Sequence, residues 1–167
     1  MDTKSLRSAF GTFATGVTVV TVGGPNPHGM TANSFASVSL DPPLLLICVG
    51  RDCVMHRALL TRRHFAVSVL AADQEKTARH FADNCRPRGW AEFQSVDWVP
   101  GRLTGAPLIS GALAYFECKL WETYDGGDHT IFVGKLLSVE EQPDRDAVLF
   151  LNGRFRHISS VTEEVAR

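Results

Sequence analysis

The feature that most constrains the fold is a pair of long strand-like segments joined by one short turn. In residues 112–124 apolar side chains recur at every second position, so in an extended chain they lie on the same face. This is the pattern of a half-buried strand. Residues 129–139 form a second strand-like segment. The residues between them, Asp125-Gly126-Gly127-Asp128, are of the types that reverse a chain tightly. The two segments are therefore predicted to form a long antiparallel hairpin.

Shorter strand signals occur elsewhere in the chain. Residues 17–22 are rich in β-branched side chains and end at a Gly- and Pro-rich turn, so we expect this run to pair with a strand beginning near His28. Residues 44–49 are apolar enough for a strand buried on both faces, and residues 65–70 alternate as a strand does. The Asn152-Gly153 pair indicates a further hairpin turn.

Short helices are predicted at the periphery of these strands. The first begins at Asp2 or Thr3, and it is expected to pack through its aromatic side chains. Its apolar face consists of Leu6, Phe10 and Phe13. Further helices are expected to begin at the capping residues Asp52 and Asp73. Because strands dominate, the sequence predicts a mainly β fold with peripheral α-helices, arranged as a closed or nearly closed antiparallel barrel.

Length and composition limit the classes of function. At 167 residues the chain is predicted to be a single domain, residues 1–167, that must place any nucleotide site on its only core. The 17 Lys and Arg residues balance 18 Asp and Glu residues, so no basic surface for nucleic acid is expected. Neither a signal segment nor an apolar run of about 18 residues occurs, so neither export nor a membrane span is expected. The four cysteines lack Cys-x-x-Cys spacing, which favours free thiols in a reducing cytoplasm and disfavours structural zinc.

The stretch from Gly29 to Pro43 is the best candidate for a ligand site. It carries hydroxyl and amide groups but no charge before Asp41, which suits a polar, extended, anionic ligand. Period 2 divides its side chains into two faces, one polar with Thr31, Asn33, Ser37 and Ser39, and one apolar with Ala32, Ala36, Val38 and Leu40. The alternative is a strand whose hydroxyl groups bond only to their own backbone.

Familiar chemical motifs are missing, which leaves single residues as candidates. No Gly-rich dinucleotide fingerprint, phosphate loop or Gly-x-Ser-x-Gly elbow is present. His129 follows a Gly-Gly-Asp turn at the mouth of a strand, where side chains often face a pocket, but the local sequence favours a strand-end histidine bonded to Asp128. Arg51 can either bind a phosphate or lie in solvent.

Five blocks of sequence, in order and spacing, resemble the flavin reductase family, whose members supply reduced flavin to two-component monooxygenases. The resemblance covers roughly residues 5–158. The blocks are Phe10–Thr21, Gly29–Leu45, Phe65–Ala71, Gly105–Leu108 and Gly127–His129.

The resemblance implies an FMN-binding split β-barrel that forms a homodimer. It also implies an NAD(P)H:flavin oxidoreductase that uses NADH, or possibly NADPH, to reduce FMN or FAD. The reduced flavin would then pass to a separate flavin-dependent monooxygenase.

The same resemblance implies roles for residues at matching positions. Those expected to contact the flavin phosphate and ribityl chain are Thr31, Ala32, Asn33 and Ser34, and those beside the isoalloxazine ring are Ser37, Val38 and Ser39. Those expected at the phosphate or adenylate side are Val49, Gly50, Arg51 and Cys53, with His80 and Phe81 reaching the flavin. His129 is expected to orient the nicotinamide, near Arg154 and Phe155.

One departure from the family leaves the choice between FMN and FAD open. Many relatives carry small hydroxyl residues after the strand at 44–49, whereas this chain has Arg51-Asp52-Cys53-Val54. Two other functions remain alternatives. One is a flavin-binding electron carrier of the same fold that does not turn over pyridine nucleotide, and the other is a relative of pyridoxamine-phosphate oxidase, which would need a more basic phosphate pocket.

Overall fold

The computed structural model describes residues 2–142 and 144–158, and these residues form a mainly β fold. The strands are β1 (Thr15–Gly16), β2 (Thr18–Val22), β3 (His28–Ala32), β4 (Ala36–Leu40), β5 (Pro43–Gly50), β6 (His64–Val69), β7 (Trp98–Pro100), β8 (Pro107–Ile109), β9 (Ala114–Gly126), β10 (His129–Glu141), β11 (Val148–Leu151) and β12 (Arg154–His157). The helices are α1 (Thr3–Phe10), α2 (Val54–Arg62) and α3 (Glu75–Ala82), with short 3-10 turns η1 (Ala72–Gln74) and η2 (Gly89–Phe93).

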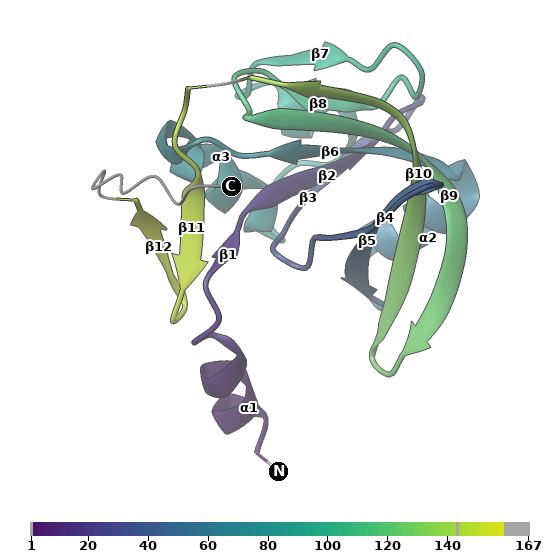
Figure 1. Ribbon diagram of the computed structural model, residues 1–167. Coiled ribbons are helices and arrows are strands. Elements are labelled where there is room, and N and C mark those ends of the chain that lie inside the picture. The colour runs from purple at the N-terminus through teal and green to yellow at the C-terminus, as the bar shows by residue number, and fades with distance from the viewer. Residues whose placement is uncertain (1, 143, 159–167) are drawn as a thin grey trace.

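The main sheet is a split barrel. Seven strands follow the order β3-β2-β6-β9-β10-β5-β4, and each neighbouring pair is antiparallel. Its edges, β3 and β4, are consecutive in the chain but not bonded to each other, and only residues 33–35 join them. A link this short spans at most roughly 10 Å. The sheet must therefore curve until its two edges lie near each other, as Figure 1 shows. We call the gap between β3 and β4 the seam.

The long hairpin predicted from the sequence forms the middle of this sheet. β9 pairs with β10 from Gly126 and His129 at the turn to Ala114 and Glu141 at the far end. The predicted pairing of residues 17–22 with the strand at His28 is also confirmed, because β2 pairs with β3. The predicted turn at Asn152-Gly153 joins β11 to β12, which form a smaller sheet with β1.

Two of the three apolar clusters among the described residues position the elements of the site. One lies inside the barrel and is built around Phe65, Ile47 and Phe132, each fully buried. The other contains Phe81 and Phe93 and fixes α3 and η2 against the outside of the barrel. Together they hold α3 and η2 next to the edge strand β3, which α3 and η2 both contact.

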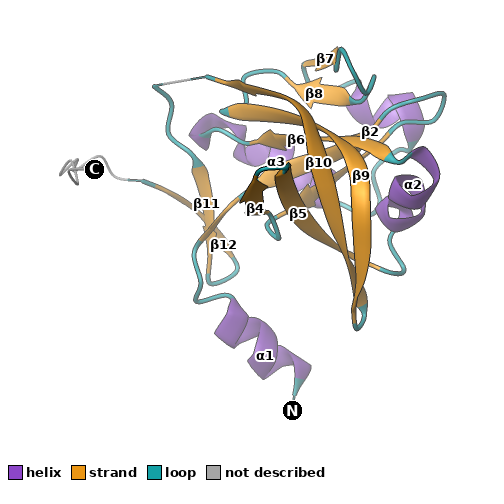
Figure 2. Ribbon diagram, turned by 45° about the vertical axis from the view of Figure 1, so that its right-hand side comes forward, coloured by secondary structure: helices purple, strands orange, loops and turns teal. Residues whose placement is uncertain are grey.

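Three sequence predictions about helices are wrong in detail. Asp2 caps α1 as predicted, but α1 has no buried residue, and Phe10 and Phe13 are 73% and 77% exposed. Among the described residues, the first helix therefore buries none of its side chains, and it stands away from the barrel (Figure 2). The helices expected to begin at Asp52 and Asp73 have Cys53 and Gln74 as their N-caps instead.

The polar stretch is also different from its predicted form. It is not one extended strand but two edge strands separated by residues 33–35, with a bulge in β4 opposite β5. The predicted apolar face holds only for Ala32, which is buried. Val38 is 47% and Leu40 is 95% exposed. Among the described residues, no helix is long and apolar enough to cross a membrane.

Candidate functional site

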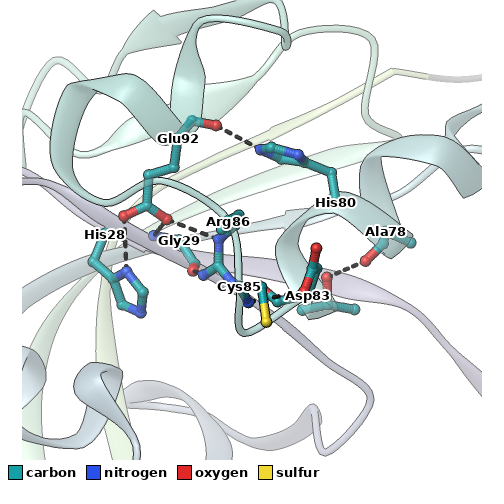
Figure 3. Close-up of polar contacts among 9 residues, drawn as sticks. His28, Gly29, Ala78, His80, Asp83, Cys85, Arg86 and Glu92 are labelled. Carbon is teal, nitrogen blue, oxygen red and sulfur yellow. Dashed lines mark hydrogen bonds and ion pairs between the residues drawn. The ribbon is translucent and has the colours of Figure 1, made fainter.

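A buried carboxylate, Glu92 of η2, organises the β3 side of the seam. Its side chain is fully buried. One carboxylate oxygen, Oε1, lies 2.8 Å from Nδ1 of His28. The other, Oε2, accepts the backbone N–H of Gly29 at 3.2 Å and Nε–H of Arg86 at 3.1 Å (Figure 3). Both oxygens of this buried acid are therefore satisfied, as a buried charge requires.

Arg86 completes the network from the opposite direction. Its guanidinium donates to the carbonyl oxygens of Gly29 and Asp83, and only 8% of its side chain is exposed. The N–H and the C=O of Gly29 are thus bonded to Glu92 and Arg86 rather than to another strand. Burial alone would raise the pKa of Glu92, but His28, the Gly29 N–H and Arg86 together hold this pKa below its ordinary value.

A cavity of about 510 Å³ opens beside this network, between β3, the start of α2 and the segment after α3. Its volume lies within the roughly 300–1,000 Å³ of ordinary ligand pockets. We call it the first cavity. Its lining includes His28, Met30, Thr31, Asp52, Cys53, Val54, Phe81, Asn84, Arg86 and Arg88.

The lining of the first cavity suits a ligand that is part anionic and part apolar. Arg88 supplies a positive charge beside the negative charge of Asp52, whereas the charge of Arg86 is paired with Glu92 behind the wall. The N-cap of α2, Cys53, lines the cavity and makes no side-chain capping bond, so the N-terminal end of this helix faces the cavity without a side-chain cap from this residue. Phe81 and Met30 add apolar wall. A phosphate attached to a flat, partly apolar group fits this donor set.

Close packing fixes Phe81 at the wall of the first cavity. The side chain is buried, and a Cβ placed on Gly29 would lie only 2.6 Å from its ring. The neighbouring His80 points away from the cavity, because its Nε2 lies 2.7 Å from the backbone oxygen of Glu92 (Figure 3). His80 therefore helps to hold η2 in place.

Three of the residues predicted from the sequence line the first cavity: Thr31, Cys53 and Phe81. The hydroxyl group of Thr31 donates to the carbonyl of Ala78 at 2.6 Å, which ties β3 to α3. Two other predicted residues, Ala32 and Val49, have side chains in the barrel core, so only their backbones are available to a ligand.

A second group of predicted residues meets at the end of the long hairpin. Gly50 pairs with His129 across β5 and β10. Arg51 donates through Nε to the carbonyl of Gly127 at 2.8 Å and lies 3.2 Å from a carboxylate oxygen of Asp125. This contact makes Arg51 a clamp on the hairpin turn.

His129 is exposed, and its Nδ1 lies 2.7 Å from a carboxylate oxygen of Asp128. A Cβ placed on Gly50 would lie 3.3 Å from Sγ of Cys53 and 3.8 Å from Nε2 of His129. The histidine ring therefore lies across Gly50 from the rim of the first cavity.

The remaining predicted residues lie around the seam or beyond it. Asn33 lines a separate cavity of about 280 Å³, which also includes Thr15, whose buried hydroxyl has no hydrogen-bond partner among the described residues. The hydroxyl group of Ser34 both donates to the carbonyl of Cys48 and accepts its N–H, which anchors the link between β3 and β4. Residues 37–39 are in β4, at the other edge of the seam.

Arg154 and Phe155 lie in β12, in the small sheet rather than on the barrel. Phe155 packs against the outer apolar cluster, and the guanidinium of Arg79 lies 4.7 Å from the centre of its ring. The structure does not bring these two residues to the first cavity.

Sequence reasoning missed the residues that give this site its charge: His28, Arg86, Arg88 and Glu92. The run Arg86-Pro87-Arg88-Gly89 is predicted to end a helix. Its two arginines are the sequence feature that could have indicated a charged site. Glu92 carried no signal, because its partner His28 is 64 residues away in sequence.

Comparison with known proteins agrees with this structure. A family model described as "Flavin reductase like domain" matches residues 10–159. An NADH-dependent FAD reductase of Streptomyces globisporus is 58% identical over 163 residues, covering 98% of this chain and 90% of that protein. A flavin-dependent monooxygenase reductase subunit, HsaB of Rhodococcus jostii (strain RHA1), is 34% identical, covering 95% of this chain and 79% of that protein.

A solved structure gives the same result in three dimensions. BorF, the flavin reductase component of a bacterial two-component tryptophan halogenase, is 57% identical, with a TM-score of 0.92 over 95% of this chain and 99% of that chain. The five blocks of sequence, the split barrel and these likenesses agree. The chain therefore belongs to the flavin reductase family.

Proposed function

We propose that this protein is an NADH-dependent flavin reductase. The observation that carries the proposal is the 58% identity, over almost the whole chain, to an NADH-dependent FAD reductase. The charge and shape of the first cavity support it independently. When both ligands are bound, the nicotinamide supplies a hydride and the flavin accepts it, so the protein must hold the two rings together and exclude water.

We assign the flavin phosphate to the first cavity. Arg88 and the N-terminal end of α2 supply the positive field that it requires, and Arg86 is held behind the wall by Glu92. From there the segment 31–34 leads to the cavity that contains Asn33 and the unpartnered hydroxyl of Thr15. That hydroxyl is a free hydrogen-bonding group for the polar edge of a flavin ring.

We assign His129 to the nicotinamide. It lies beyond Gly50 from the rim of the first cavity, and its Nε2 makes no hydrogen bond to the described residues. This atom can bond to a carboxamide, while Asp128 fixes the orientation of the ring through Nδ1.

We further propose that the reduced flavin is passed to a separate oxygenase. BorF serves a two-component halogenase and HsaB serves a monooxygenase, and each is described as a reductase component or subunit. We also place the protein in the cytoplasm, because its four cysteines, Cys48, Cys53, Cys85 and Cys118, are all free thiols.

We propose a homodimer, with α1 and β4 at the interface. Phe10, Phe13 and Leu40 are 73%, 77% and 95% exposed, which is unusual for large apolar side chains. A second copy is the simplest partner for a helix that has no buried residue in the described part of the chain.

The function is tested by mixing the purified protein with NADH and either FAD or FMN in a stopped-flow spectrophotometer without oxygen. Rapid bleaching of flavin absorbance is expected, and it should be much slower with NADPH. Flavin that binds but is not bleached by NADH would instead identify an electron carrier.

A further inference from the structure

A second cavity, of about 260 Å³, adjoins the first on the far side of Arg88. The two cavities share His28, Val54 and Arg88 in their linings. The second cavity is bounded by one face of α2 and by the turn before β3. It is smaller than the roughly 300 Å³ at which whole-ligand pockets begin, so it suits one part of a longer ligand.

The second cavity gathers positive charge that the protein does not neutralise. Arg57, Arg62 and Arg88 line it, and within the described ranges none of them has a carboxylate within 4 Å. Its only acid, Glu92, is already bonded to His28 and Arg86. Three guanidinium groups around one cavity create a positive potential that favours binding of an anion there.

The walls of this cavity are built to hold polar side chains in place. A Cβ on Gly24 would lie 2.9 Å from Cζ of Arg62, so the guanidinium rests directly on the backbone of the turn. A Cβ on Gly89 would lie 2.6 Å from Oδ1 of Asn26. Both glycines have positive φ, +103° and +69°, a conformation that larger residues rarely adopt. Arg62 and Asn26 are therefore held where only glycine allows them.

These groups match one kind of ligand fragment. Arginine binds phosphate oxygens in pairs through its planar fork, and Arg88 stands where a chain of phosphates would cross from one cavity to the other. The amide group of Asn26 offers a donor and an acceptor side by side, the arrangement that pairs with the edge of adenine.

We propose that the second cavity is a subsite for the adenosine diphosphate group of a dinucleotide. This inference rests on the proposed function, which places a flavin phosphate in the first cavity. FAD and NADH both carry this group and FMN does not, so the experiment must distinguish two sources of the same chemistry.

The test is the double variant Arg57→Ala/Arg62→Ala, whose two side chains are exposed and line the second cavity but not the first. The affinities for FAD and FMN are measured by quenching of flavin fluorescence, and KM for NADH is measured with FMN as acceptor. The loss of charge-assisted contacts to a diphosphate is expected to weaken binding roughly tenfold or more. If FAD is the source, its Kd rises by that factor and the Kd of FMN is unchanged. If NADH is the source, its KM rises instead.

Arg102→Ala is the matched control, because Arg102 is an exposed arginine that lines a different cavity. Equal weakening of FAD and FMN, reproduced by this control, would reveal only a general electrostatic field and would overturn the subsite. So would a double variant in which FAD, FMN and NADH all behave as in the wild type.

Titration with ADP separates this inference from the proposed function. Calorimetry should detect ADP binding to the wild-type protein, and the double variant should weaken it roughly tenfold. This result is expected even if the protein fails to reduce flavin. A wild-type protein that reduces flavin but does not bind ADP would overturn the subsite and leave the function intact.

Discussion

Glu92 is the residue on which the β3 side of the seam depends. It is buried, it is charged, and it bonds to His28, Gly29 and Arg86 at once. Removing one partner from a buried ion pair costs more than the pair contributes, because the remaining charge stays buried without compensation.

Glu92→Gln should therefore destabilise the protein by about 3–5 kcal/mol, measured by urea unfolding at pH 7. Glu75→Gln is the control, because Glu75 pairs with Arg79 one helical turn away near the surface and such a pair is worth about 0.3–0.5 kcal/mol. Equal effects of the two substitutions would show that Glu92 contributes no more than a surface charge.

The stability that Glu92 contributes should depend on pH, in the direction set by its pKa shift. The pKa of Glu92 is lower in the folded protein than its ordinary value of 4.5, so the unfolded state binds more protons. The stabilisation is therefore complete above pH 4.5 and is lost as the pH falls through the folded-state pKa. The wild type and Glu92→Gln should converge in stability in strong acid, as monitored by circular dichroism.

His129 provides a second test at the scale of one residue. If its ring orients the nicotinamide, His129→Ala should raise KM for NADH or slow hydride transfer by several-fold to roughly tenfold, the value of one hydrogen bond plus lost alignment. Flavin affinity should stay nearly unchanged. A lower melting temperature with unaltered kinetics would instead assign His129 to the turn that it shares with Asp128.

At the scale of the element, β3 must lie close enough to α3 for Gly29 to touch Phe81. A methyl group at this position would lie 2.6 Å from a ring that is itself packed against Phe93 and His80. Gly29→Ala should destabilise the fold by roughly 1–3 kcal/mol and weaken flavin binding, because Phe81 has to move. Gly16→Ala is the control for stability, since a methyl group there meets nothing within 4 Å. Urea unfolding of both variants and flavin titration of Gly29→Ala test the prediction.

Local sequence patterns predicted the strands better than they predicted which residues pack against each element. The β9–β10 hairpin and the β2–β3 pair followed from alternation and turn residues, because both signals are local. The exposure of Phe10 and Phe13 did not follow, because periodicity marks an apolar face and does not say what covers it. The first cavity was predicted only in part. Thr31 lies in a matching block and Phe81 at a matching position, but Arg86 joins β3 through contacts distant in sequence.

At the scale of the whole molecule, the exposed apolar residues predict association. Phe10→Ser/Phe13→Ser should shift sedimentation from dimer toward monomer at micromolar concentration, with little loss of fold stability because neither side chain is buried. Leu103→Ser is the control, as Leu103 is 57% exposed on a loop elsewhere. A wild-type protein that sediments as a flavin-competent monomer would contradict the proposed interface.

The network at Glu92 also bears on aggregation. At an ordinary sheet edge, unpaired N–H and C=O groups are a template for a strand from another molecule. In β3 the backbone groups of Gly29 are instead occupied by the side chains of Glu92 and Arg86. Loss of these two side chains would expose this edge as well as lower the stability of the fold. Variants of Glu92 or Arg86 should therefore polymerise edge to edge in addition to unfolding more readily.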